Sequence, residues 1–264
     1  MTDLLNPLAG FLVGVLVGFT GVGGGALMTP ILVFLFGVAP QTAVGTDLLF
    51  ASMTKAVGGW VHGQRGSIDW LVLRRLSLGS LPAAVLTVAV LRHAPAQEGL
   101  RAMLLPTLGV ALVLTALAML FKTQLYQLGR RLRTGSPERF KRFQPPLTVL
   151  AGAVLGVLVT LTSVGAGALG VVMLVYLYPF RLTPPKLVGT DIAHAIPLTL
   201  VAGLGHLSIG NVDFRLLGSL LIGSIPGIII GSRLTLRVNE RYVRNAVALV
   251  LAVVGARLVL QLAK

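Results

Sequence analysis

Two aspartates and one lysine interrupt stretches that are otherwise apolar. Asp47 and Asp191 each follow the tripeptide Val-Gly-Thr, and Lys55 lies eight residues after Asp47. At 100° per residue, Asp47, Lys55 and His62 share one face of a helix. Ionisable side chains at membrane depth are costly and usually face a partner or a wet pathway. Lys55 can attract an anion or pair with Asp47, whereas the carboxylates can carry protons, bind a cation or cap a helix.

A second polar stripe follows the second Val-Gly-Thr-Asp motif. Asp191 and His206 occupy the equivalent arc, Thr199 stands in the place of Lys55, and His194 lies nearby. Because only one copy has a lysine, the two halves cannot attract an anion equally. Histidine titrates near neutral pH, although a core hydrogen bond is the alternative role for His194. The predicted proton-coupling residues are Asp47, Asp191, His194, His62 and His206.

Glycine clusters break two apolar stretches. Four glycines lie within residues 21–25, and the second cluster occupies 165–167 beside two hydroxyl residues, Thr162 and Ser163. A break in hydrocarbon is tolerated where it is buried in protein or lines a cavity, and the N-terminus of the next helix favours an anion. Close packing is the alternative, and it is our prediction for Gly10, Gly14 and Gly18. The predicted substrate-binding residues are Thr20, Gly21, Gly23, Gly24, Gly25, Thr46, Lys55, Ser163, Gly165, Gly167 and Thr190.

The chain repeats itself at a constant offset of 144 residues. Sixteen positions between 40 and 82 are identical to their partners without a gap, from Pro40 and Pro184 to Pro82 and Pro226. A repeat this long indicates duplicated halves, as many transporters have. The repeated Asp69 and Asp213 each follow a short polar stretch and are predicted to cap helices.

The repeat predicts an all-α polytopic membrane protein. Each half has about five helical segments, and the second segment of each half is too short to span comfortably. It is therefore predicted to be a broken or re-entrant helix, and the odd number of crossings inverts the second half. We expect a first membrane repeat at 1–121, a basic linker at 122–144 and a second, inverted repeat at 145–264. The predicted segments are 5–20, 24–37, 41–62, 70–91, 99–121, 146–163, 167–180, 185–206, 213–232 and 242–263.

Charge placement predicts the orientation. The chain is 55% apolar and only 11% charged, so lipid is its expected solvent. The linker has seven basic residues against the single acid Glu138, which predicts a cytoplasmic position and termini outside. Sixteen of the 22 basic residues fall in predicted cytoplasmic stretches, which explains the net charge of +14 without nucleic acid as a partner. The lipid bilayer is the expected partner, with anionic lipid at the linker.

Several classes of protein are not supported by the sequence. There is no cysteine, which excludes disulfides and thiol catalysis. The usual metalloprotease, serine hydrolase and nucleotide-binding motifs are also missing, so we expect no enzyme, cofactor, metal site or ATP-driven pump. The alternatives to anion transport are cation transport on the paired aspartates and a non-transporting membrane assembly protein.

Two motifs resemble those of a known family. The pattern G-x-G-G-G-x-L-x-x-P from Gly21 to Pro30, and Ala-Val-Gly-Thr-Asp from Ala43 to Asp47, are similar to motifs of the sulfite exporter TauE/SafE family. The resemblance covers nearly the whole chain and implies export of sulfite, sulfoacetate or a related sulfur-containing anion across a bacterial inner membrane. The second glycine cluster departs from the pattern at Ala166 and Ala168.

Overall fold

The computed structural model describes residues 2–20, 25–61, 67–93, 97–135, 137–234 and 240–262. Within these ranges the secondary structure is entirely helical, and five helices are long and apolar enough to cross a membrane. The fold class is therefore confirmed: the chain is an all-α polytopic membrane protein. The helices are α1 Thr2–Thr20, α2 Gly25–Phe34, α3 Pro40–Val61, α4 Trp70–Arg92, α5 Gln97–Leu120, α6 Lys122–Gly135, α7 Pro137–Thr162, α8 Ala168–Leu177, α9 Pro184–Ser208, α10 Phe214–Leu234 and α11 Glu240–Leu262.

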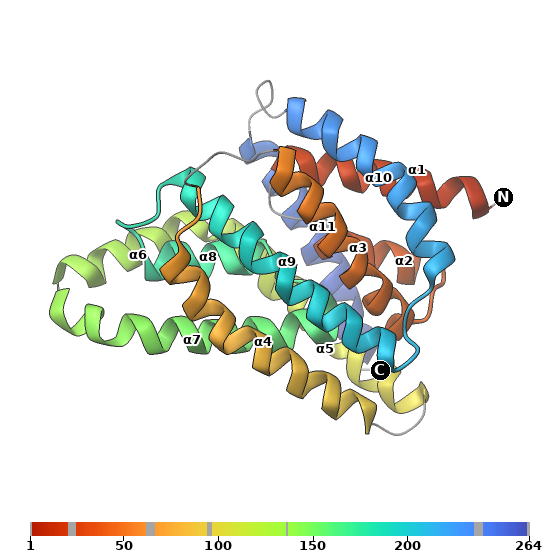
Figure 1. The fold of residues 1–264 in the computed structure, drawn as a ribbon, viewed down its shortest axis with the longest axis horizontal. Coiled ribbons are helices and arrows are strands. Elements are labelled where there is room, and N and C mark those ends of the chain that lie inside the picture. The colour runs from red at the N-terminus through yellow and green to blue at the C-terminus, as the bar shows by residue number, and fades with distance from the viewer. Residues whose placement is uncertain are drawn as a thin grey trace.

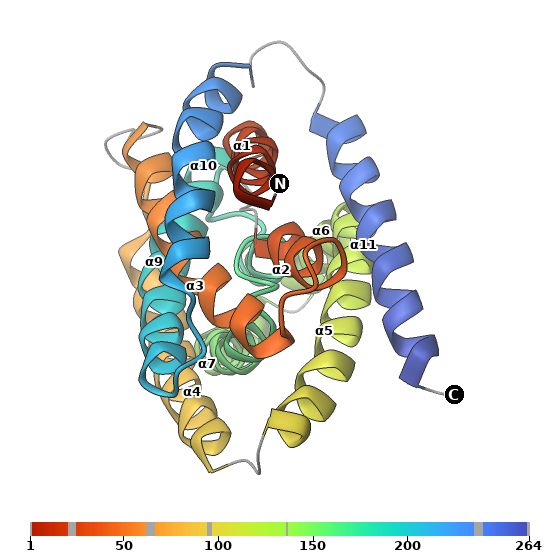
Figure 2. The same ribbon diagram turned by 90° about the vertical axis from the view of Figure 1, so that its right-hand side faces the viewer.

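The two repeats exchange helices with each other. The first helix of each half packs along the fourth helix of the other half, so α1 lies on α10 and α7 lies on α4. The fifth helices, α5 and α11, pack together at one side of the molecule (Figure 2). Each half therefore buries its apolar surface against the other half.

Glycines form the seams between these paired helices. A Cβ at Gly10 would lie 2.2 Å from the carbonyl oxygen of Leu220, and one at Gly14 would lie 2.4 Å from that of Ser224. Gly79 and Gly152 bring α4 and α7 together in the same way. The predicted packing role of Gly10 and Gly14 is confirmed, because any side chain there would separate the helices.

Helices α3 and α9 cross at the centre and run antiparallel. Leu49 contacts Gly203, the Ser52 hydroxyl lies 3.5 Å from the carbonyl oxygen of Ile196, and Gly59 faces Ile192. Because Ser52 and Ile196 are equivalent positions of the repeat, the pseudo-two-fold axis passes between them. This is the arrangement expected of inverted repeats.

The second segment of each half is a half-helix. Helices α2 and α8 have 10 residues each, about 15 Å of rise, which is half the thickness of the hydrocarbon core. Helix α8 turns back along α7, since the Gln144 amide donates to the carbonyl of Leu177 at 2.5 Å while Ser163 lies at the other end of both helices. The pair is a helical hairpin with its tip at residues 163–167.

The linker differs from the expected segment boundaries. Residues 122–135 form α6, and α7 begins at Pro137, nine residues before the predicted start at 146. Arg130 holds α6 against the loop after α8, because its guanidinium lies over the rings of Tyr126 and Phe180. Figure 1 shows the turn between α6 and α7 at the left end of the molecule, whereas α1 begins and α11 ends toward the right.

Candidate functional site

The tip between α7 and α8 has an irregular backbone. Ser163 has a φ of 59°, Gly165 of 110° and Gly167 of 136°. Such positive values suit glycine, and a non-glycine residue that adopts one is uncommon. Gly167 caps α8 without a side-chain hydrogen bond. The tip therefore presents the N-terminus of α8, a partial positive charge, inside the protein.

Lys55 reaches this tip from the opposite repeat. Its side chain is buried, with 4% of the residue exposed, and its ammonium donates a hydrogen bond to the carbonyl oxygen of Ala166. The negative charges of Asp191 and, less strongly, of Asp47 also act on it. Lys55 is thus a buried cation held by the tip of one repeat and by carboxylates of both.

Asp191 lies against the first turn of α8. A Cβ at Gly170 would lie only 2.3 Å from the Asp191 Oδ1 atom, so glycine is required for this approach. Asp191 is 2% exposed, and Lys55 contributes the strongest charge acting on it. Asp191, Lys55 and the α8 tip form one half of the central cluster.

Asp47 occupies the equivalent position in the other half but has different partners. Its Oδ2 atom accepts hydrogen bonds from the Thr29 amide at 3.2 Å and from the Thr29 hydroxyl at 2.5 Å. Its Oδ1 atom has no hydrogen-bond partner, and neither does the buried Ser163 hydroxyl, which lies close enough to act on this carboxylate. Thr199, the counterpart of Lys55, donates instead to the carbonyl of Ala195 in its own helix.

The histidines of α9 are buried but lie in different surroundings. The His194 Nε2 atom is 2.8 Å from the Ser80 hydroxyl, and the charge of Lys55 acts on its ring. His206 is farther along α9, with Nε2 2.9 Å from the carbonyl of Thr160 and Nδ1 3.4 Å from the Asn211 amide. His194 therefore borders the cluster, and His206 does not.

Thr46 and Thr190 join the two repeats. The Thr46 hydroxyl accepts from the amide of Asp213 at 3.0 Å, and the Thr190 hydroxyl accepts from the amide of Asp69 at 2.9 Å. The preceding glycines allow this approach, because a Cβ at Gly45 would lie 2.1 Å from the carbonyl of Asn211. In this structure the Gly-Thr motif forms two equivalent joints between the repeats.

The predicted capping role of the repeated aspartates is confirmed. Asp69 accepts from the amide of Val72, and Asp213 accepts from those of Arg215 and Leu216. Gly21, Gly23, Gly24 and His62 lie outside the described residues, while Thr20 ends α1 and Gly25 begins α2. The predicted binding role of the first glycine cluster therefore stays a prediction.

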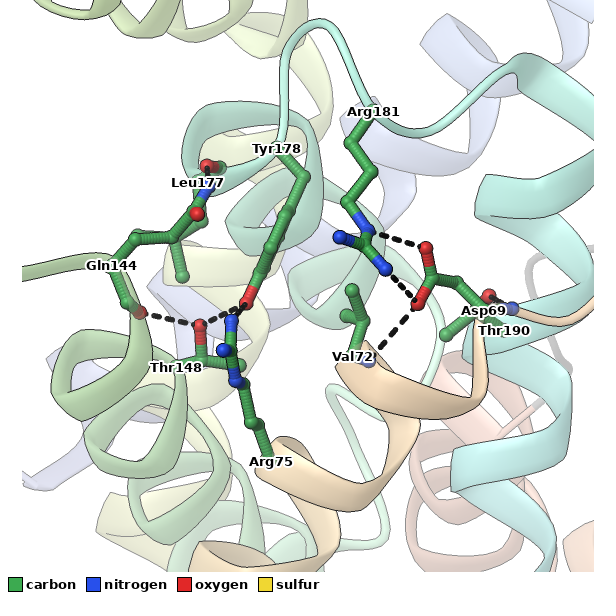
Figure 3. Close-up of polar contacts among 9 residues, drawn as sticks. All are labelled: Asp69, Val72, Arg75, Gln144, Thr148, Leu177, Tyr178, Arg181 and Thr190. Carbon is green, nitrogen blue, oxygen red and sulfur yellow. Dashed lines mark hydrogen bonds and ion pairs between the residues drawn. The ribbon is translucent and has the colours of Figure 1, made fainter. Parts of the chain in front are cut away.

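One joint carries an additional polar network (Figure 3). Arg181 donates to both carboxylate oxygens of Asp69, at 2.6 and 3.0 Å. Tyr178 contacts Arg75 and Thr148 through its hydroxyl group. The position equivalent to Arg181 in the first repeat is Gly37, so the joint at Asp213 has no such ion pair. Among the described residues, the two joints therefore differ by this ion pair.

We expect Arg181→Gln to lower stability by on the order of 1 kcal/mol, since Arg181 is partly exposed. Burial alone would raise the pKa of Asp69, but the hydrogen bonds from Arg181 hold it below its usual value. The ion pair between Arg181 and Asp69 therefore contributes to folding stability at neutral pH. This contribution is lost as the pH falls through the lowered pKa of Asp69. Thermal unfolding measured from pH 7 to about pH 3 tests this, and the melting temperatures of wild type and variant should converge at the lowest pH. Arg131→Gln, on exposed α6, is the control, and a difference that persists in acid would contradict the assignment.

The residues of the central cluster lie within the protein. Asp47, Lys55, Asp191 and His194 are all buried. The two described pockets lie elsewhere, one of about 390 Å³ beside Ala56 and one of about 490 Å³ between α2 and α11. Neither of these two pockets is lined by a residue of the cluster.

These features define a class of protein: a polytopic membrane protein of two inverted repeats, with half-helices whose ends meet a buried charged cluster at the centre. Such geometry is typical of secondary transporters. The chain belongs to the sulfite exporter TauE/SafE family, whose sequence profile matches residues 7–258. It is therefore assigned to membrane transporters, and the alternative of an assembly protein is not carried forward.

Relatives of similar length support this assignment. The chain is 39% identical over 257 residues to "Probable membrane transporter protein YjnA" of Bacillus subtilis (strain 168), covering 96% of this chain and 98% of the relative. It is 27% identical over 276 residues to "Probable membrane transporter protein MJ0441" of Methanocaldococcus jannaschii, covering 96% and 94%. No solved structure matches.

Sequence reasoning missed several partners in the site. Thr29 is a polar residue in an apolar half-helix, one turn after the glycine cluster, and this position is a usable signal. Ser80 is one of the repeated identities, which also marks it. The bond from Lys55 to Ala166 has no sequence signal, because a backbone carbonyl is available at every residue.

Proposed function

We propose that this protein is a secondary transporter that exports a small sulfur-containing anion, such as sulfite or an organosulfonate like sulfoacetate, with proton coupling. The observation that carries the proposal is Lys55, a buried ammonium at the tip in front of α8. The family name supports the substrate class. The chain acts as a transporter and not as an enzyme, and its expected location is a bacterial-type inner membrane with the linker in the cytoplasm and the termini outside.

The anion would bind between Lys55 and the N-terminus of α8. The first amide groups of a helix have no partner within it and favour an anion. The Ser163 hydroxyl, buried and unpartnered in this structure, is available to donate a hydrogen bond to the anion. Gly165 and Gly167 let the backbone approach closely. Movement of the two halves at the Thr46 and Thr190 joints would open the cluster to one side and then to the other.

Binding to the purified protein tests the proposal. A ligand that binds the folded state raises its apparent stability, so we expect one sulfur oxyanion among sulfite, sulfoacetate, sulfate and taurine to raise the melting temperature, unlike chloride. Ser163→Ala should weaken the affinity about tenfold, equivalent to about 1.4 kcal/mol. Ser208→Ala, which changes an exposed serine at the end of α9, is the control.

Cation transport is the second candidate, because the cluster has two carboxylates and one lysine. A rise in melting temperature with sodium or potassium, with none from any anion in the panel, would establish that function and remove the anion proposal.

A further inference from the structure

The two halves of the cluster are neutralised differently. Lys55, supplied by the other repeat, contributes the strongest positive charge acting on Asp191. At the position that would supply a cation to Asp47, the second repeat has Thr199, which is engaged with Ala195. The charge of Lys55 therefore acts more strongly on the carboxylate of the second repeat than on that of the first.

Asp47 also keeps an open hydrogen-bonding position. It is fully buried, Thr29 occupies Oδ2, and both Oδ1 and the neighbouring Ser163 hydroxyl are without partners. A buried carboxylate without an adjacent cation is strongly disfavoured in its charged form and tends to be neutralised. The Ser163 hydroxyl suits both states of this group, since it can donate to an ionised Oδ1 atom and accept from a protonated Oδ1–H group.

The charged groups around Asp47 do not neutralise its buried carboxylate. Lys55 interacts first with Asp191 and only second with Asp47. The charge of Lys55 acts on His194 of α9, and that of Lys122 of α6 acts on Asp191, whereas α2 presents the amide and the hydroxyl of Thr29 to Asp47. The ionisable residues of α5 and α10 lie at the helix ends, at Glu98, Arg101, Arg215 and Arg233. The described side chains of Asp47, Thr29 and Ser163 offer four oxygen atoms, which are too few to replace the hydration shell of a metal cation.

We propose that Asp47 takes up the coupled proton at Oδ1, and that Lys55 permanently fills the corresponding position beside Asp191. The inference rests on the proposed function and selects one carboxyl group among the five proton-coupling candidates. The proton enters from the aqueous side that the cluster faces, and it leaves as the carboxylate re-forms on the other side. Neutralising Asp47 removes negative charge near the anion site, so proton and anion are expected to move in the same direction.

Proteoliposomes with an entrapped pH dye measure this coupling. Sulfoacetate is a suitable probe, because its acid groups are ionised at pH 7 and do not buffer the dye. The readout is protons moved per anion moved, expected to be one for the wild type. Asp47→Asn should lower this ratio at least tenfold. Thr199→Ala, which changes a buried hydroxyl bonded within its own helix and not placed in the binding site, should keep it at one.

Infrared spectroscopy gives a test that needs no substrate. The protein should show the C=O stretching band of a buried carboxylic acid, which Ser163→Ala shifts and Asp191→Asn leaves unchanged. The inference is overturned if that band is missing, if Asp47→Asn keeps proton movement, or if sodium drives transport in the wild type. An absence of sulfoacetate flux would count against the proposed function, and the infrared band would still decide the role of Asp47.

Discussion

Gly223→Ala is expected to destabilise the protein by about 3 kcal/mol or more, although it adds only one methyl group. A Cβ at this position would lie 1.8 Å from the carbonyl oxygen of Pro7 and 2.7 Å from its carbon. Both atoms belong to the backbone of α1, so the clash is relieved only if the two helices separate. Thermal unfolding in detergent, followed by loss of helical circular dichroism, measures the effect.

The same helix supplies the control. Gly218 is exposed on α10, and a Cβ there would meet nothing within 4 Å. Alanine has the better helix propensity by about 1 kcal/mol, so Gly218→Ala should leave the melting temperature unchanged or raise it. Gly79→Ala should repeat the large loss in the other seam, since its Cβ would lie 1.9 Å from the carbonyl of Val149. If Gly223→Ala and Gly218→Ala have the same melting temperature, the seams do not have the close packing described.

Lys55→Ala is expected to cost about 3–5 kcal/mol of stability, because it leaves buried Asp191 without its cation. It should also abolish stabilisation by the sulfur oxyanion. Adding Asp191→Asn removes the uncompensated charge, so the double variant should regain most of the lost stability. It should not regain the response to the anion. Melting temperatures with and without the anion, measured for all three variants, separate the two effects.

Thr199→Ala is the matched control for this series, since Thr199 holds the repeat-equivalent position and bonds only within its own helix. It should change neither stability nor the response to the anion by more than a small amount. A double variant that responds to the anion as the wild type does would show that Lys55 stabilises the fold without binding substrate.

The architecture was largely predictable because it is recorded in the repeat. The identical positions of the two halves predicted inverted halves, the short second segments predicted α2 and α8, and the spacing of Gly10 and Gly14 predicted a seam. The linker was less predictable. The expected segment began at 146, yet α7 begins at Pro137 and continues through Pro145 and Pro146. The prolines free carbonyls at exposed Lys141 and Arg142, where water can satisfy them.

The site was predictable in its residue types but not in its pairings. Asp47, Lys55 and Asp191 are conspicuous in an apolar sequence, and all three are buried at the centre. Their partners depend on how the hairpin of one repeat packs into the other repeat. Residue spacing in the sequence does not predict this packing. The Gly-Thr motif shows the same limit, because its threonines were predicted to face substrate and they bond to the opposing helix caps.

The reciprocal joints have a consequence for biogenesis. When the first repeat leaves the ribosome, its contact partners have not yet been synthesised. The amide of Asp69 binds the later Thr190, and the glycine face of α4 packs against the later α7. Neither half can complete its structure in the bilayer alone, so the first half must persist unassembled until the second is inserted. Two separately expressed halves are therefore expected to accumulate only when they are made in the same cell. An ancestral single repeat would have needed to insert in both orientations to form a pair.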